Sequence, residues 1–171
     1  MKNSILFLFL FSVLLTTPVF AEQNNPQWGT LEKIIGTWRG EYDGHLGKGG
    51  GVIVASYDLN NAIILLKGRY EYPVTEKRPA LTHNNLMVIY QNADKKINKA
   101  MYFDDDGQAI QFTATQTDST IIFNSDKSAA SPFYKIVYTY IDKNTLDIKM
   151  EKSKDGITFS TYMQSKSQRR K

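Results

Sequence analysis

Ten short strand-like segments, separated by turns and without a helix long enough to cross between parallel strands, constrain this chain most. Residues 146–151 give the clearest pattern, because apolar and charged side chains alternate with the period of a strand. Short connections can join only antiparallel neighbours. We therefore predict an all-β domain, a single antiparallel up-and-down β-barrel of about ten strands. The expected strands are 36–42, 51–57, 62–71, 85–91, 97–103, 108–116, 119–124, 133–141, 145–151 and 157–164.

The connections predict which end of the barrel is open. In an up-and-down barrel alternate connections lie at opposite ends. The three long loops, 43–50, 72–84 and 125–132, fall at one end on this count, and we call that end the mouth. The other end, the base, has only tight turns, and a short N-terminal helix over residues 30–34 is expected to close it.

The first 21 residues have the composition of a secretory signal peptide. Lys2 supplies a positive charge, residues 5–15 form an uncharged apolar run, and small residues precede Glu22. The run is shorter than the roughly 20 residues that span a bilayer, so stable membrane insertion is not expected. We predict cleavage after Ala21, a barrel domain over residues 22–165, and a periplasmic or secreted location.

Charge and cysteine content exclude several classes of function. Four of the 21 basic residues lie in 166–171, and the remaining mature chain is nearly neutral, which is against a nucleic-acid-binding face. We expect 166–171 to be a solvated basic tail that makes at most weak contact with anionic lipid. With no cysteine, the chain has no disulfide, thiolate metal site or thiol nucleophile.

Strand alternation also predicts which side chains face the interior. Lys67 and Arg69 must face water, which turns Leu66 and Tyr70 inward. Residues 86–90 are all apolar and leave the phase open, and we predict Leu86, Val88 and Tyr90 inward. Such aromatic residues either form packed core or line a pocket for an amphipathic molecule. The predicted ligand-binding residues are Trp38, Tyr42, Leu66, Tyr70, Val88, Tyr90, Tyr102, Phe112, Tyr138 and Tyr140.

Few motifs indicate chemistry. His45 and His83 are expected in loops at the mouth, either as ordinary polar residues or as contacts to a ligand or a metal. The glycine-rich residues 44–51 lack a following helix and predict a mobile lid instead of a phosphate site. Residues 104–107, Asp-Asp-Asp-Gly, predict a hairpin turn, because the spacing of a calcium loop is absent. We predict no catalytic residue, no metal and no cofactor.

Three short motifs carry a resemblance to a known family. Residues 36–40 read Gly-Thr-Trp-Arg-Gly, residues 86–90 read Leu-Met-Val-Ile-Tyr, and residues 103–107 read Phe-Asp-Asp-Asp-Gly. In these motifs the chain resembles bacterial lipocalin-like barrels of the calycin type, whose function is unknown. Nitrobindin-type haem barrels share the opening motif and bind iron through a late histidine. This sequence has no histidine after His83, so the resemblance does not imply haem.

Three classes of function fit these residues. The first is an exported barrel that binds or carries a small hydrophobic or amphipathic molecule. The second is an enzyme of calycin fold, an isomerase or cyclase that uses tyrosine hydroxyls as acid–base groups. The third is an interaction module that contacts another protein through its mouth loops. An open interior favours the first two and a filled one favours the third.

Overall fold

The computed structural model describes residues 28–93, 98–126 and 132–171. The predicted signal peptide and its cleavage point lie outside the described residues. The chain forms a 3-10 helix, η1 (Gly29–Ile34), followed by ten strands. The strands are β1 (Gly36–Gly44), β2 (Gly49–Asp58), β3 (Ile63–Tyr72), β4 (Leu81–Gln91), β5 (Asn98–Asp104), β6 (Ala109–Gln116), β7 (Thr120–Ser125), β8 (Phe133–Asp142), β9 (Thr145–Ser153) and β10 (Ser160–Arg170).

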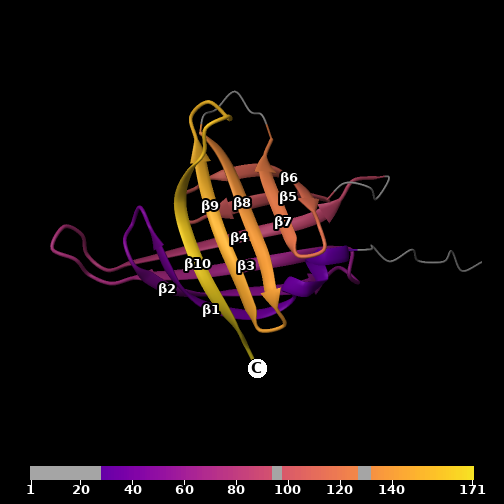
Figure 1. Cartoon of the computed structure of the whole chain (residues 1–171), viewed down its shortest axis with the longest axis horizontal. Helices are drawn as coiled ribbons and strands as arrows, with labels where there is room; N and C mark the ends of the chain where they lie inside the picture. The colour runs from indigo at the N-terminus through magenta and orange to yellow at the C-terminus, as the bar shows by residue number, and fades with distance from the viewer. Residues whose placement is uncertain (1–27, 94–97, 127–131) are drawn as a thin grey trace, which may run out of the picture.

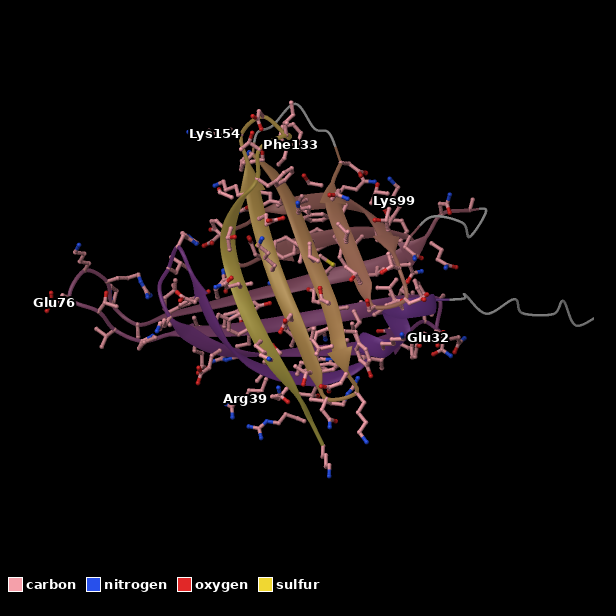
Figure 2. The ribbon with its side chains drawn as sticks, in the orientation of Figure 1. Glu32, Arg39, Glu76, Lys99, Phe133 and Lys154 are labelled. Carbon is pink, nitrogen blue, oxygen red and sulfur yellow. The ribbon has the colours of Figure 1, made fainter. Side chains whose placement is uncertain are left out.

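The strands form one closed antiparallel barrel in which each strand pairs with the next and β10 pairs with β1. This confirms the predicted all-β up-and-down barrel. Figure 1 shows β8, β9 and β10 crossing in front of β3 and β4, with the β3–β4 hairpin projecting to one side. In Figure 2 Glu76 in the β3–β4 loop and Glu32 in η1 mark opposite ends of the molecule, the mouth and the base. Among the described residues no helix has the length and apolar character needed to cross a membrane.

The pairing register decides which side chains enter the core. In β3 the alternation is regular, and Ile64, Leu66 and Tyr70 are buried as predicted. In β4 the predicted phase is wrong: Met87 and Ile89 are the buried residues. Directly opposed residues of an antiparallel pair lie on the same face of the sheet. Leu66 opposes Met87 and exposed Lys67 opposes Leu86, which places Leu86, Val88 and Tyr90 on the outer face.

Residues 29–34 close the base, but as a single 3-10 turn and not as the short helix that was expected. Trp38 is fully buried beside this turn, and its indole Nε1 donates a hydrogen bond to the Ile34 carbonyl oxygen at 2.7 Å. Thr30 Oγ1 donates to the Thr117 carbonyl, so the segment is tied to the β6–β7 turn. The guanidinium of Arg169 covers the Trp38 ring at 4.1 Å. A large indole therefore fills the base, as the opening motif indicates.

The barrel continues through the segment that we expected to be a solvated tail. Lys166 and Arg170 lie in β10, which pairs with β1 and completes the closure. The buried side chains of this strand are Ser165 and Ser167. The predicted boundary at residue 165 therefore falls inside a strand. Small polar residues on the inner face give no hydrophobic alternation, which explains why the sequence pattern ended early.

Most of the glycine-rich segment is strand and not a lid. Gly49 to Gly51 belong to β2, and only residues 45–48 form the connection between β1 and β2. A Cβ on Gly51 would lie 2.9 Å from the ring of Tyr42, and a Cβ on Gly68 would lie 2.6 Å from the Tyr70 hydroxyl. These glycines therefore leave room for two inward tyrosine rings.

Candidate functional site

A chain of polar side chains lies at the mouth end of the barrel interior. Asp105 Oδ1 lies 3.0 Å from His83 Nδ1, and His83 Nε2 lies 3.5 Å from the Tyr102 hydroxyl. Asn85 Nδ2 donates to the hydroxyls of both Tyr102 and Tyr70, at 3.4 Å each. With a proton on Nδ1 facing Asp105, Nε2 accepts the Tyr102 hydroxyl hydrogen. The chain thus connects the rim to the buried tyrosines.

The elements that carry this chain fix its geometry. His83 and Asn85 lie on the inward face of β4, opposite Tyr70 and Gly68 of β3. Asp105 follows β5 in a tight turn, in which Gly107 has a positive φ of 82° and its amide donates to the Asp104 carbonyl. This confirms the predicted hairpin turn.

The carboxylate of Asp105 is held by its neighbour on the facing strand. Its Oδ2 accepts hydrogen bonds from the amide nitrogen and the side-chain Nδ2 of Asn84, at 2.8 Å each. These bonds lower the pKa of Asp105. Asp105 therefore stays ionised beside His83.

Four tyrosines from four strands converge below this chain. Tyr42 and Tyr70 meet edge to face with ring centroids 4.9 Å apart, and Tyr42, Tyr70 and Tyr102 all lie close enough to Tyr138 to disfavour its ionisation. Burial raises the pKa of Tyr70 to about 12. It also raises the pKa of Tyr42, Tyr102 and Tyr138 above the usual value. All four hydroxyls are therefore neutral at physiological pH.

The Tyr42 hydroxyl stands out within the cluster. It is buried and has no hydrogen-bond partner of normal geometry among the described residues. The hydroxyls of Ser165 and Ser167 lie near it and lower its pKa in part, although burial raises that pKa more. Those two serines bond to each other at 3.0 Å. An unpaired buried hydroxyl is costly, so this oxygen is a natural place for a water or a ligand atom.

Several apolar side chains toward the mouth end of the barrel are only partly buried and pack against the core. Ile110 opposes Tyr102 across β5 and β6, and Met150 opposes Met163 across β9 and β10. Leu46, in the β1–β2 turn, also packs against the core from above. Below this level the core residues Phe112, Phe123, Ile64, Ile89 and Ile121 are almost completely buried.

The far rim of the mouth is aromatic and basic. Lys152 Nζ lies 5.7 Å from the ring centroid of Tyr134 and 5.5 Å from that of Tyr162. His45 stacks on Tyr162 at 3.9 Å, and its Nε2 lies 2.8 Å from the Tyr162 hydroxyl. Burial, Lys152 and His83 lower the pKa of His45, which favours its neutral form.

The structure separates the predicted ligand-binding residues into four groups. Tyr42, Tyr70, Tyr102 and Tyr138 come together as described. Leu66 and Phe112 are core residues, and Trp38 lies at the base. Tyr140 also lies toward the base, under the ammonium group of Lys33 at 5.5 Å. Val88 and Tyr90 face outward, so their predicted inward placement is wrong.

Only one of the two histidines lies where it was predicted. His45 is in the β1–β2 turn at the mouth, as predicted, whereas His83 is inside β4 and not in a loop. Sequence reasoning missed Asn85, Met150 and Met163 as parts of the mouth. Asp105 could have been linked to His83 only by knowing that the 104–107 turn lies against the start of β4. That knowledge requires the register of the β4–β5 pair.

Two hollows lie on the outside of the barrel. One, of about 2280 Å³, is lined by residues of β1, β2, β3, β8, β9 and β10, among them acidic and basic side chains. The other, of about 620 Å³, lies over β2 to β5, where Val54 and Phe103 are 40% and 43% exposed. The first mixes both signs of charge, so it offers no uniform field to a charged partner.

One group of side chains could hold a metal ion. Among the described residues, ligand atoms of His83, Asp105 and Asp106 lie within 4.8 Å of one another. The group sits at the outer end of the polar chain.

Comparison with known proteins gives a fold and no family. No protein-family model matches the chain, and no curated protein matches it. An S-type phycobiliprotein lyase from Guillardia theta has a similar structure, with a TM-score of 0.53 at 11% identity over 85% of this chain and 99% of that one. At this identity the likeness establishes a shared barrel fold and nothing about activity.

Two further structures are similar over the same extent with lower TM-scores. A de novo designed fluorescence-activating β-barrel matches with a TM-score of 0.43 and 8% identity, over 84% of this chain and 100% of that one. A protein of unknown function from the DUF3598 family of Nostoc punctiforme matches with a TM-score of 0.30 and 9% identity, over 84% of this chain and 99% of that one.

Proposed function

We propose that this protein binds a small amphipathic molecule at the mouth of its barrel, and that it does so after export as a lipocalin-like carrier. The observation that carries the proposal is that partly buried apolar side chains and a chain of polar side chains both occur at the mouth end of the barrel interior. Partly buried Ile110 lies directly opposite Tyr102 of the polar chain, and partly buried Met150 and Met163 pack against the same core from β9 and β10. Small-molecule sites combine apolar walls with a few placed polar groups in this way.

The ligand sits at the mouth and not deep in the barrel. Phe112 and Phe123 are completely buried below the mouth, so a deeper ligand would have to displace packed core. Methionine side chains are unbranched and adapt to irregular shapes, which suits Met150 and Met163 to contact with a flexible apolar chain. The polar end of the ligand faces Tyr102 and Asn85, which direct it with neutral hydrogen bonds.

The chemistry of the tyrosines favours binding over catalysis. An acid–base catalyst works best with a pKa near the operating pH. Burial instead raises the pKa of Tyr102 and Tyr138 above the ordinary value of tyrosine. These hydroxyls orient a ligand and exchange protons poorly, so the isomerase or cyclase alternative loses its acid–base groups.

A titration with a fluorescent fatty acid tests the proposal. Dansyl-undecanoic acid should bind with one site per barrel. Replacing Ile110 by Trp should weaken binding about tenfold, because the larger ring takes ligand space at the mouth. Tyr102→Phe removes one hydrogen bond of about 1 kcal/mol, which corresponds to about fivefold weaker binding.

Matched controls come from the outer face of the barrel. Val54→Trp adds the same ring to an exposed outward position, and Tyr90→Phe removes a hydroxyl from a tyrosine on the outer face of β4. Both controls should bind the probe as tightly as the parent protein. Non-saturable binding, or equal loss in the controls and the mouth variants, would refute a site at the mouth.

A further inference from the structure

We infer that the rim of the mouth holds a divalent metal site made by His83 Nδ1 and one carboxylate oxygen each from Asp105 and Asp106. The inference does not depend on the amphipathic ligand. It rests on three donor atoms from two elements, β4 and the β5–β6 turn, that lie within 4.8 Å of one another. An imidazole with two carboxylates is a donor set for a first-row divalent ion of the zinc type.

The distances between the donor atoms suit one ion. His83 Nδ1 is 3.0 Å from Asp105 Oδ1 and 3.7 Å from Asp106 Oδ2. Ligands about 2.1 Å from a common ion are about 3.0–3.4 Å apart in tetrahedral or octahedral geometry. A shift of a few tenths of an ångström in the exposed Asp106 side chain completes the arrangement.

The two neighbouring carboxylates of Asp105 and Asp106 also favour binding of a cation. The carboxylates of Asp105 and Asp106 approach the same imidazole nitrogen, and within the described part of the chain their ion pairs are with His83 alone. No lysine or arginine of those ranges forms an ion pair with either carboxylate. Two adjacent carboxylates repel each other, and a divalent ion removes this repulsion.

Neighbouring groups hold the ligands in a binding orientation. Asn84 donates two hydrogen bonds of 2.8 Å to Asp105 Oδ2, from its backbone amide and its side-chain Nδ2. Asp105 Oδ1 therefore stays directed at His83. Tyr102 contacts the other nitrogen of the His83 ring. Metal-binding histidines use their second ring nitrogen in this way, which fixes the ring and its tautomer. The three protein ligands leave coordination positions open toward solvent.

Binding changes the tautomer of His83. The ion takes the Nδ1 lone pair, and the single proton of the neutral imidazole moves from Nδ1 to Nε2 by exchange with solvent, with no net release of a proton. The Nε2–H group then donates to the Tyr102 hydroxyl oxygen. This change gives a spectroscopic signature that a loosely held surface ion would not produce.

The test uses untagged protein and zinc chloride alone. Isothermal titration should give one zinc ion per chain, and ¹⁵N NMR should show His83 moving to the Nε2–H tautomer. Asp106→Asn should weaken zinc binding at least tenfold, and His83→Gln should abolish it. Asp106 is 73% exposed as a side chain, so its replacement leaves the fold intact, which circular dichroism verifies.

His45→Gln is the matched control, because His45 is the other histidine at the mouth and contributes no donor atom to the site. It should bind zinc like the parent protein. Absence of one-site binding at millimolar zinc would overturn the inference, as would equal affinity in parent and Asp106→Asn, or loss in His45→Gln. Because no fatty acid is present, failure here leaves the proposed amphipathic site untouched.

Discussion

Adding one methyl group at Gly51 should destabilise the barrel, whereas the same change at the adjacent Gly50 should not. A Cβ at residue 51 would lie 2.5 Å from the Arg69 carbonyl oxygen and 2.9 Å from the Tyr42 ring. A backbone oxygen cannot move aside as a flexible side chain can, so β2 and β3 must separate locally. Overpacking of this kind costs about 1–3 kcal/mol.

Gly50 faces the other way and supplies the control. Its Cβ would approach only the Gly40 carbonyl oxygen, at 3.6 Å, which is an ordinary contact. Replacing Gly by Ala at an unstrained position stabilises by about 0.4–1 kcal/mol, because the unfolded chain loses freedom. The two variants should therefore differ by about 1.4–4 kcal/mol in free energy of unfolding, with Gly51→Ala the less stable.

Urea denaturation followed by tryptophan fluorescence measures this difference, since Trp28 and Trp38 are both buried in the folded state. The slope of the transition should be the same in both variants, because the surface exposed on unfolding does not change. In thermal melts Gly51→Ala should lower Tm by about 2–12 °C. Equal midpoints for the two variants would show that the tyrosine ring and β3 do not press on Gly51, and the packing argument would fail.

Further predictions concern the base, the ionisable groups and the N-terminus. Trp38→Ala should cost about 3–5 kcal/mol in urea denaturation, since a fully buried indole leaves an unfilled space; an unchanged midpoint would place Trp38 at the surface. Hydrogen bonds from two backbone amides and a serine hydroxyl lower the pKa of Asp155 to about 2. Its stabilising contribution is therefore present above pH about 4 and lost as pH falls toward 2. Carboxyl NMR should give that midpoint, and an ordinary value of about 4 would contradict it. Burial raises the pKa of Tyr70 to about 12, so stability should fall as pH rises from about 10 toward 12, with tyrosinate absorbance at 295 nm appearing late. Normal titration near pH 10 would contradict this burial. Finally, mass spectrometry of the protein from its host should find Glu22 at the N-terminus, and an intact Met1 would refute cleavage.

The orientation of a strand can be predicted well only when charged residues identify the face that is exposed to water. In β3, Lys67 and Arg69 identify the outer face, because burying either charge unpaired is costly. In β4, residues 86–90 are all apolar, and both phases satisfy the hydrophobic pattern equally. Pairing of Leu66 with Met87 resolves the choice, and that pairing is a property of the closed sheet.

The candidate site depended on tertiary structure even more. His83 and Asp105 are 22 positions apart, and nothing in their local sequences indicates a shared contact. They meet because the β5–β6 turn folds back against the start of β4, where the Asn84 carbonyl accepts a hydrogen bond from the Asp105 amide. A histidine beside threonine and two asparagines has the composition of a loop, so it was expected in one. Pairing with β3 draws that segment into the sheet.

The class of fold, the number of strands, their connections and the placement of Trp38 could be predicted from the sequence, because they follow from short-range periodicity and turn chemistry. The orientation of β4, the extension of β10 to Arg170 and the role of the glycines around Gly51 could not be predicted and follow from the closed sheet. Each of those depends on what lies across the barrel. Closing ten strands fixes one register for all of them, and a local pattern contains no information about a neighbour that is distant in sequence.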